Sequence, residues 1–404
     1  MIEDRLAAAG LPPLGRLSWL EVDVGALADN LRLLQRLAGG VPVSAVVKAD
    51  AYGHGVEAAA QAFLDAGAER LCVATLDEAL LLRGAGISAP LLVLFRVADD
   101  VMPLAAEHGI ELTIADETSV DGLARLLPAG AALTVHIEVE TGLGRAGIRP
   151  DRVAGVMATL ADRDGVKVAS IWTHLASAGD EAISRQQVAA FERAVAGLRD
   201  AGLPVPARHV AASGGILAAS APSYDGVRPG LCLYGLVPDG LTLSPTAAEA
   251  ARGLRPALQL KARPLRIEEM AVGEAVSYGS HWRADRPSRI CTLPVGYADG
   301  WPRLSWPGGE VLVHGRRVPL VGTVAMDAVM ADVTDMPAAD LDSEFTFLGV
   351  DGSESITADD VARARNTISW EVVSTLATRL PRVYHAGPVL VGTRTLTSHR
   401  RTTE

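Results

Sequence analysis

Cysteine is scarce in this sequence, which has three cysteines in 404 residues. Cys72, Cys232 and Cys291 lie far apart and form neither a CxxC pair nor an even set. This spacing argues against a disulfide framework and against the usual zinc-binding patterns, so no metal site is predicted. Reduced, buried thiols of this kind are typical of a cytoplasmic protein.

The sequence also lacks long apolar runs, basic clusters and aromatic residues. The apolar run "LLVLF" (91–95) is far shorter than the ~20 residues that span a bilayer. The first fifteen residues, "MIEDRLAAAGLPPLG", lack the basic and apolar regions of a signal peptide. A net charge of −11 and an aromatic content of 4% argue against nucleic-acid binding. The composition therefore predicts a cytoplasmic protein that acts on a small molecule, with no membrane or nucleic-acid partner.

Short apolar runs alternate with helical patterns between residues 40 and 235. The candidate strands are 43–48, 71–75, 91–95, 110–115, 133–139, 167–174, 208–213 and 226–235. The alanine- and leucine-rich stretches between them end in glycine, as helices commonly do. Eight strand–helix units predict a (β/α)8 TIM barrel over residues 16–245. An open doubly wound sheet is the alternative, although no GxGxxG follows the first run.

The texture changes after about residue 250, where proline and glycine recur among β-branched runs such as "RICTLPVG" and "FTFLG". This pattern predicts a mainly antiparallel β domain over 246–404, interrupted by one helical segment at 358–380. Residues 1–15 are predicted as an arm. The run 17–24 precedes the barrel strands and is a candidate strand of the second domain.

Charged and polar residues follow the carboxyl ends of the barrel strands, where barrel enzymes carry out their chemistry. The set comprises Lys48, Glu138, Arg145, His174, Ser213 and Arg228. Ordinary structural roles are open to single members, since Arg145 could form a surface ion pair and His174 could be a hydrogen-bonded core histidine. The position of all of them at one end of successive strands favours a shared site.

Pyridoxal phosphate is the cofactor that this set of side chains suits. A glycine-rich turn after Ser213 can hold phosphate through backbone N–H groups, and Arg228 can face a ring nitrogen. Lys48 would form the Schiff base and must lose its proton to do so. Burial and neighbouring cations lower the pKa of such a lysine.

Seven motifs make a resemblance to a known family specific. They are "AVVKADAYGHG", "ETGLGRAGI", "WTHLASA", "VRPGLCLYG", "VSYG", "LPVGYADG" and "GTVAMD". Their order and approximate spacing resemble those of the alanine racemase family. That family has fold type III pyridoxal-phosphate enzymes, with a barrel and a C-terminal β domain. The resemblance implies a racemase that moves the α-proton of an amino acid, in a homodimer with shared active sites.

The resemblance also implies residue roles. Lys48 matches the lysine that holds the cofactor and acts as one base, and Tyr278 matches the opposing base, which the other subunit supplies in the family. The cofactor contacts carried over are Tyr52, Arg145, His174, Ser213, Arg228, Gly230, Leu231 and, at a tyrosine position, Trp370. Arg145 and Met326 match residues that hold the substrate carboxylate. Tyr297 and Asp327 are expected to support them.

Several positions depart from the family pattern. Glu138 stands where the family usually has a lysine, often carbamylated to an anion, so Glu138 could supply the same charge directly. Trp370 replaces a tyrosine whose hydroxyl meets the phosphate, and an indole can only donate. Thr323 replaces an arginine of the outer channel, Ala325 a cysteine or similar residue, and Gly179 an acidic residue or alanine. These changes are expected to strip charge from the entrance.

Three functions remain open from the sequence. The first is a racemase, with alanine as the default substrate and another small or neutral amino acid as an alternative. The second is a paralogue that uses the same pocket for another Cα reaction, although Cys291 does not lie in the acidic motif of the related decarboxylases. The third is a non-catalytic pyridoxal-phosphate-binding protein, against which the second domain with Tyr278 counts. Fold analogy alone does not choose among them.

Overall fold

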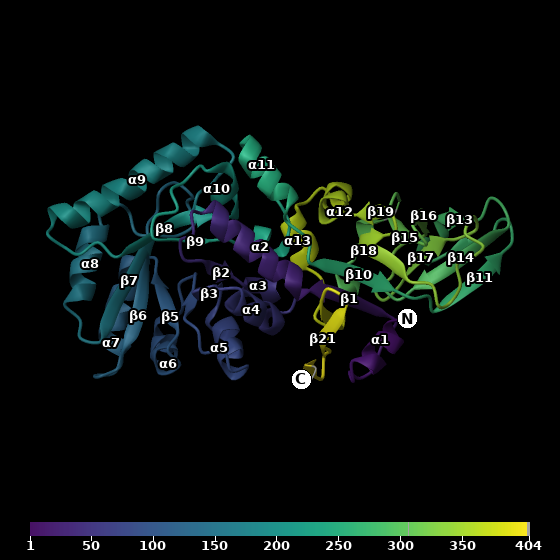
Figure 1. Ribbon diagram of the computed structural model, residues 1–404, viewed down its shortest axis with the longest axis horizontal. Helices are drawn as coiled ribbons and strands as arrows, with labels where there is room; N and C mark the ends of the chain where they lie inside the picture. The colour runs from purple at the N-terminus through teal and green to yellow at the C-terminus, as the bar shows by residue number, and fades with distance from the viewer. Residues whose placement is uncertain (306, 402–404) are drawn as a thin grey trace. The chain divides into compact units, whose positions relative to one another are not determined.

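The protein was analysed as a computed structural model that describes residues 1–305 and 307–401. The chain divides into two compact units. One unit, called the barrel unit here, is formed by residues 27–51 and 56–255. The second, called the β unit here, is formed by residues 1–26, 52–55 and 256–404. Figure 1 labels the helices and many of the strands of both units.

The barrel unit contains eight parallel strands in the order β2 to β9. They are β2 (Ser44–Val46), β3 (Arg70–Val73), β4 (Leu91–Val93), β5 (Glu111–Ile114), β6 (Leu133–Glu138), β7 (Val166–Trp172), β8 (Ala207–Ala212) and β9 (Gly226–Arg228). A parallel bridge between Val43 and Val227 nearly closes the sheet. The predicted barrel is therefore confirmed.

Helices cover the outside of the barrel strands, as the alternating pattern predicts. They are α2 (Val24–Leu37), α4 (Val56–Asp65), α5 (Leu76–Gly84), α6 (Met102–Glu107), α7 (Glu117–Leu126), α8 (Val153–Ala161), α9 (Glu181–Asp200), α10 (Ser213–Ala218) and α11 (Pro245–Arg252). Short 3₁₀ turns occur at η1 (Asp99–Val101) and η2 (Leu231–Tyr234). The strand expected over 226–235 thus ends at Arg228, because the chain turns into η2.

The β unit contains a large sheet in which most neighbours are antiparallel. Its strands are β1 (Ser18–Asp23), β10 (Leu258–Ala262), β11 (Arg266–Met270), β14 (Ser288–Leu293), β15 (Glu310–Val313), β16 (Arg316–Val321), β17 (Val329–Asp332), β18 (Phe345–Asp351), β19 (Glu354–Ile356), β20 (Arg382–Ala386), β21 (Val389–Arg394) and β22 (His399–Arg401). A separate hairpin pairs β12 (Ala275–Val276) with β13 (Trp282–Arg283). The run 17–24 lies in this sheet as β1, which pairs antiparallel with β10 and parallel with β20.

The N-terminal residues fold as helix α1 (Ile2–Ala8). Its Ile2 and Leu6 belong to a buried apolar cluster with Trp19 and Val383. Because both side chains are 1% exposed, residues 2–8 are a packed part of the β unit and not a free arm. Three 3₁₀ turns complete the unit: η3 (Tyr278–Ser280), η4 (Tyr297–Asp299) and η5 (Arg303–Ser305).

The helical segment expected over 358–380 is two helices, α12 (Ala358–Arg365) and α13 (Ser369–Ser374). Asn366 ends α12 in the left-handed conformation, with a φ of 53°. Asparagine tolerates this conformation better than most residues, so the break follows from a local residue. α13 then carries Trp370.

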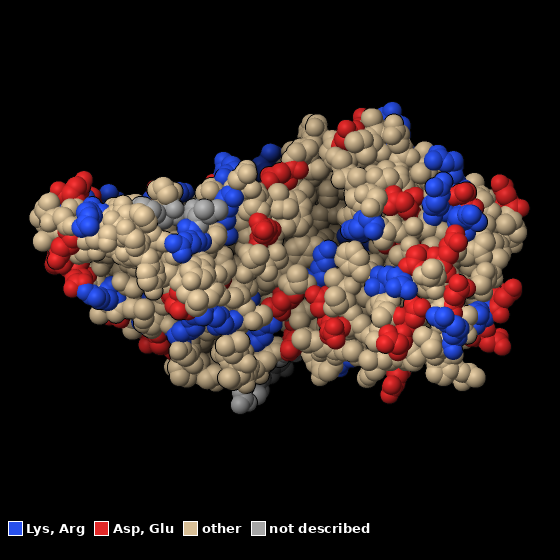
Figure 2. Space-filling model, turned by 180° about the vertical axis from the view of Figure 1, so that it is seen from behind, with Lys and Arg blue, Asp and Glu red and all other residues tan. Residues whose placement is uncertain are grey.

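Two features of the surface bear on the predicted partners. No helix of the described residues is long and apolar enough to cross a membrane. On the face seen in Figure 2, Lys and Arg side chains are interspersed with Asp and Glu, and no extended basic surface is visible.

Candidate active site

Lys48 begins a left-handed turn directly after β2. The four residues Ala49 to Tyr52, all with side chains, have φ angles of 53°, 54°, 55° and 51°. A left-handed conformation costs roughly 1–2 kcal/mol per residue, so neighbouring contacts must hold the turn. Ala49 N donates to Glu78 Oε1 over 2.6 Å, and Val56 N donates to Asp50 Oδ1 over 2.9 Å. The expected strand therefore ends at Val46, and the turn fixes the backbone on which Lys48 stands.

The two glycines of "AYGHG" are required by close backbone contacts within the β unit. A Cβ at Gly53 would lie 2.1 Å from the carbonyl oxygen of Val373, and a Cβ at Gly55 would lie 2.0 Å from the hydroxyl of Tyr384. Arg382, which is fully buried, also donates to the Gly53 carbonyl oxygen over 3.0 Å. Tyr52, 8% exposed, is thus held on a tightly packed segment.

The Lys48 amine lies in an environment that favours its neutral form. Burial lowers its pKa, and the charge of Arg145 lowers it further. Lys48 Nζ lies 5.9 Å from the ring centre of Phe95, and Arg145 Cζ lies 5.0 Å from the same ring. An amine with a lowered pKa can act as a nucleophile and as a base near neutral pH.

Glu138, the last residue of β6, holds Arg145. Arg145 Nη2 lies 3.3 Å from Glu138 Oε1. Glu138 is 2% exposed, and burial raises its pKa while Arg145 opposes that shift. Its second oxygen, Oε2, is buried without a hydrogen-bond partner. The pair therefore leaves one carboxylate lone-pair site open beside the arginine.

His174 follows β7 and is neutral at physiological pH. Burial lowers its pKa to about 3, and the charges of Arg228, Arg145 and Lys48 add to the effect. These three cations therefore all disfavour a charge on the same imidazole. Gln187 of α9 holds the loop by donating to the His174 carbonyl oxygen over 3.2 Å.

Arg228 ends β9 and is fixed by three hydrogen bonds. Nη1 donates to His209 Nδ1 and to the His209 carbonyl oxygen, the latter over 2.9 Å, and Nη2 donates to the Thr173 carbonyl oxygen over 2.7 Å. The guanidinium carbon lies 4.5 Å from the ring centre of Trp172. Burial lowers the Arg228 pKa to about 10, so the group stays charged at neutral pH. Its Nε–H and one Nη2–H remain outside these three bonds.

Ser213, Gly230 and Leu231 form a cup of hydrogen-bond donors. Ser213 Oγ accepts from Gly230 N over 2.9 Å and from Cys232 N over 3.2 Å, and the hydroxyl has one proton of its own to donate. Leu231 begins η2, so its N–H has no acceptor inside that turn. A Cβ at Gly214 would lie 2.9 Å from the Ala178 side chain, so glycine is required there. The cup offers donors that suit a phosphate group.

In the β unit, Tyr278 stands on the hairpin of β12 and β13 and is 70% exposed. Thr323 Oγ1 donates to the Tyr278 carbonyl oxygen over 3.0 Å, and Ser277 Oγ donates to the Thr323 carbonyl oxygen over 2.5 Å. Thr323 is 6% exposed. Thr323, at the position of a family arginine, is therefore buried and holds the hairpin that carries Tyr278.

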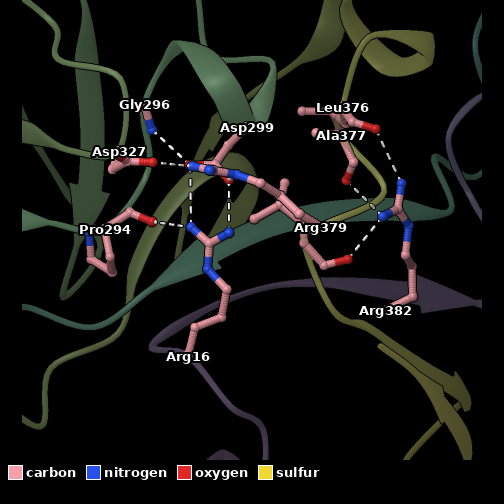
Figure 3. A network of polar contacts seen from close by, with 10 residues as sticks. Arg16, Pro294, Gly296, Asp299, Asp327, Leu376, Ala377, Arg379 and Arg382 are labelled. Carbon is pink, nitrogen blue, oxygen red and sulfur yellow. Dashed lines mark hydrogen bonds and ion pairs between the residues drawn. The ribbon is translucent and has the colours of Figure 1, made fainter. Parts of the chain in front are cut away.

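Tyr297, Met326 and Asp327 lie together around the buried carboxylate of Asp299. Tyr297 N donates to the Ala325 carbonyl oxygen over 3.1 Å, which joins the two loops. Figure 3 shows Arg379 donating to both carboxylates. Its Nε donates to Asp299 Oδ1 over 2.6 Å, and its Nη2 donates to Asp299 Oδ2 over 3.1 Å and to Asp327 Oδ1 over 2.6 Å.

Arg16 completes the network of Asp299. It donates to Asp299 Oδ1 over 2.8 Å and to the Pro294 carbonyl oxygen over 2.9 Å. Two arginines on one buried carboxylate hold its pKa below the usual range, although burial alone would raise it. Charge-assisted pairs of this kind give a defined geometry, so the network orients the loops of Tyr297 and Met326. These two side chains are 41% and 51% exposed.

Two further departures from the family pattern are Trp370 and Gly179. Trp370 is half-buried on α13. A Cβ at Gly179 would lie 2.3 Å from the Gly240 carbonyl oxygen, so the absence of a side chain there lets two backbone segments of the barrel unit approach.

Sequence reasoning missed several residues that hold the site. Glu78, Phe95, His209 and Asp299 were not singled out. Asp299 lies within "GYADG", so the motif itself carried a signal for it. Glu78, Phe95 and His209 are distant in the sequence from the site residues that they contact, so no local pattern points to them.

The carboxyl edge of the barrel carries an amine of lowered pKa, a fixed arginine and a cup of hydrogen-bond donors. This arrangement is that of an enzyme that acts on a small molecule with a lysine as nucleophile or base. The alanine racemase N-terminal domain matches residues 22–238, and the alanine racemase C-terminal domain matches residues 257–384. The chain belongs to the alanine racemase family, and it is an amino-acid racemase.

Individual relatives cover nearly the whole chain. It is 36% identical to an alanine racemase of Halothermothrix orenii over 373 residues, 91% of this chain and 97% of the relative. The structure of an alanine racemase from Bacillus anthracis with bound L-Ala-P has a TM-score of 0.88 at 33% identity, and covers 96% of this chain and 99% of that one. A histidine racemase of Leuconostoc mesenteroides has a TM-score of 0.82 at 29% identity, covering 93% and 99%.

Proposed function

We propose that this protein interconverts L- and D-alanine with pyridoxal 5'-phosphate as its cofactor. The observation that carries the proposal is the Lys48 amine, whose pKa is lowered by burial and by Arg145 at the edge where Arg228 is fixed. When bound, pyridoxal phosphate supplies an electron sink that makes the α-proton of an amino acid more acidic. The residues of this chain then have to bind, orient and move one proton.

The donors of the barrel unit support a cofactor assignment. Ser213, Gly230 and Leu231 would hold the phosphate, and Tyr52 would add its hydroxyl. Arg228 would donate to the pyridine nitrogen, for which it has N–H groups left after its bonds to His209 and Thr173. His174 would lie beside the ring as a neutral imidazole, because its pKa is about 3. An arginine that stays charged keeps its proton and leaves the ring nitrogen unprotonated.

Inversion of the α-carbon requires one base on each face. Lys48 would hold or release the proton on one face, and Tyr278 of the partner subunit on the other. Tyr278 is 70% exposed in the single chain, whereas a base that moves a substrate proton works in a site shielded from bulk water. A second subunit that covers Tyr278 would provide that shielding, which supports the assignment. We therefore propose a homodimer with shared sites, in which the exposed Tyr297 and Met326 are also covered.

Arg145 and Met326 would hold the substrate carboxylate, with Glu138 and Asp327 as supporting residues. Arg145 offers a bidentate guanidinium to a carboxylate, and the buried Glu138 fixes its position. We further propose a cytoplasmic location and a domain division near residue 245, as expected from composition.

A second candidate substrate is another small neutral amino acid. Trp370 favours it, because the family resemblance implies a tyrosine at this position, and an indole differs from a phenol in shape and can only donate. The histidine racemase of Leuconostoc mesenteroides has a similar structure, so the fold alone does not choose the substrate.

The decisive experiment incubates the purified, cofactor-loaded protein with each L-amino acid in deuterated water. We expect α-deuteration and the D-enantiomer to appear together, first with alanine. Loss of both with Lys48→Ala is the matched control. Deuteration without inversion, or release of carbon dioxide or ammonia, would assign another Cα reaction. No exchange with any amino acid would leave only a binding function.

A further inference from the structure

A continuous chain of buried polar side chains runs through the barrel to Arg228. It begins at Glu111, the first residue of β5, and ends at Arg228, the last residue of β9. The members of this buried polar chain are Glu111, His136, Ser170, His209 and Arg228, one from each of five neighbouring strands. Four of the five are no more than 6% exposed, and the side chain of Glu111 is 14% exposed.

The contacts along this chain are short and unbroken. Glu111 Oε2 lies 2.9 Å from His136 Nε2, and His136 Nδ1 lies 2.6 Å from Ser170 Oγ. The same Ser170 oxygen lies 2.6 Å from His209 Nε2, and His209 Nδ1 accepts from Arg228 Nη1. Arg70 closes the far end by donating to Glu111 Oε2 over 2.6 Å. Every nitrogen of both imidazole rings therefore has a partner.

The chemistry of the two ends fixes the direction of every bond. An arginine only donates, so His209 Nδ1 must be unprotonated and its proton must be on Nε2. The Nε2–H of His209 donates to Ser170 Oγ, and the Ser170 hydroxyl donates to His136 Nδ1. His136 carries its proton on Nε2 and donates to the Glu111 carboxylate, which only accepts. Both histidines are neutral in this arrangement, and burial lowers the pKa of each.

We infer that Ser170, His136 and Glu111 are positioning residues that fix the tautomer of His209 and, through it, the guanidinium of Arg228. The other tautomer would turn an N–H of His209 toward the N–H groups of Arg228 and repel it. With the tautomer fixed, the plane of Arg228 is set by His209, Thr173 and Trp172, and its free N–H groups keep one direction. This role rests on the proposed function, in which Arg228 donates to the ring nitrogen of the cofactor.

Ser170 offers the clearest test of the chain, because its single oxygen joins the two histidines. Ser170→Ala removes that oxygen and leaves the Nε2–H of His209 buried without an acceptor, which releases the tautomer. Ser170→Thr keeps the hydroxyl and should restore the wild-type state. Thr113→Val is the matched control, since Thr113 is a buried residue of β5 whose hydroxyl donates to the Val93 carbonyl oxygen, outside the chain.

The readout is ¹⁵N NMR of the full-length protein with labelled histidine, which reports the protonated nitrogen of each ring. We expect wild-type His209 with its proton on Nε2 and an acceptor Nδ1. Ser170→Ala should shift the signals of His209 and His136, while Ser170→Thr and Thr113→Val leave the tautomer unchanged. In parallel, kcat for the racemase reaction should fall on the order of tenfold in Ser170→Ala, with KM nearly constant.

Glu111→Gln gives a second test if Ser170→Ala does not fold. The amide oxygen can still accept from His136, but the negative end of the chain is lost, so a smaller shift of the same signals is expected. The inference would be overturned if His209 carried its proton on Nδ1, or if the ¹⁵N signals of His209 and His136 were the same in both variants as in the wild type. Failure of the proposed function has a different signature: no amino acid exchanges its α-proton, although the His209 tautomer is the expected one.

Discussion

Arg145 Nη2 lies 3.3 Å from Oε1 of Glu138, while Oε2 of the same carboxylate is buried without a partner. The arginine is therefore held by an ordinary carboxylate, at a position where the family resemblance implies a carbamylated lysine. A carboxylate is permanent, whereas a carbamate depends on dissolved carbon dioxide. Arg145 should accordingly be held whether or not carbon dioxide is present.

Glu138→Gln is expected to weaken the positioning of Arg145 and to lower kcat/KM for alanine. The loss should correspond to about 1–3 kcal/mol, the range for a hydrogen bond to a charged group. Steady-state kinetics with and without bicarbonate measure both points, and bicarbonate should have no effect on the wild type. Wild-type kinetics in Glu138→Gln would show that the anion has no role.

Thr323→Val is expected to loosen the hairpin that carries Tyr278. The hydroxyl of Thr323 donates to the Tyr278 carbonyl oxygen, and valine keeps the shape without the donor. If Tyr278 serves one face of the substrate, deuterium wash-in should slow more from one enantiomer than from the other, by a few fold. Thr323→Ser keeps the donor and should behave as the wild type. Equal slowing from both enantiomers would instead indicate a general loss of stability.

His174 should make the protein less stable as the pH falls below about 6.5. Its folded-state pKa is about 3, so between pH 6.5 and 3 the unfolded chain binds a proton that the folded protein does not. Each pH unit in this window should remove at most about 1.4 kcal/mol of unfolding free energy. Urea midpoints at pH 7.5 and 5 measure the effect.

His174→Gln should make that pH dependence shallower by about one proton. The exposed His108 provides a control, since His108→Gln makes the same substitution at the surface of the protein. If both variants keep the wild-type slope, other groups set the acid sensitivity of the barrel.

The barrel strands could be predicted because each is a short apolar run buried on both faces, which leaves a plain signal in the sequence. The same signal failed where the backbone turns for tertiary reasons. The turn after Lys48 is left-handed because Glu78 and Asp50 hold it, and neither contact has a local signature. The expected helix over 358–380 breaks at Asn366, where a single left-handed residue outweighs the helical pattern on both sides.

The candidate site divides in the same way. Lys48, Arg145, His174 and Arg228 stand at strand ends, so the barrel rule alone could gather them. His136, Ser170 and His209 lie inside strands and read as ordinary alternating residues. Only the parallel pairing and register of the neighbouring strands β6, β7 and β8 bring their side chains into one chain, so a single sequence could not reveal it.

A mixture of two inactive variants should recover activity if the sites are shared. Lys48→Ala removes one base and Tyr278→Phe the other, so each homodimer is inactive. A heterodimer regains one intact site, because the wild-type residues of the two chains meet there. Random exchange should give up to roughly a quarter of the wild-type activity. No recovery after verified subunit exchange would count against a shared site.

Trp370→Tyr addresses the substrate. The tyrosine hydroxyl should restore one phosphate contact that the indole cannot make, because an indole only donates from its ring nitrogen. We expect cofactor affinity and alanine turnover to rise together in Trp370→Tyr, whereas a wild type that prefers a different neutral amino acid to alanine would support the second candidate substrate. Cofactor titration and a panel of L-amino acids measure the two effects. If the wild type turns over alanine fastest and Trp370→Tyr changes neither quantity, Trp370 is a tolerated substitution and alanine is the substrate.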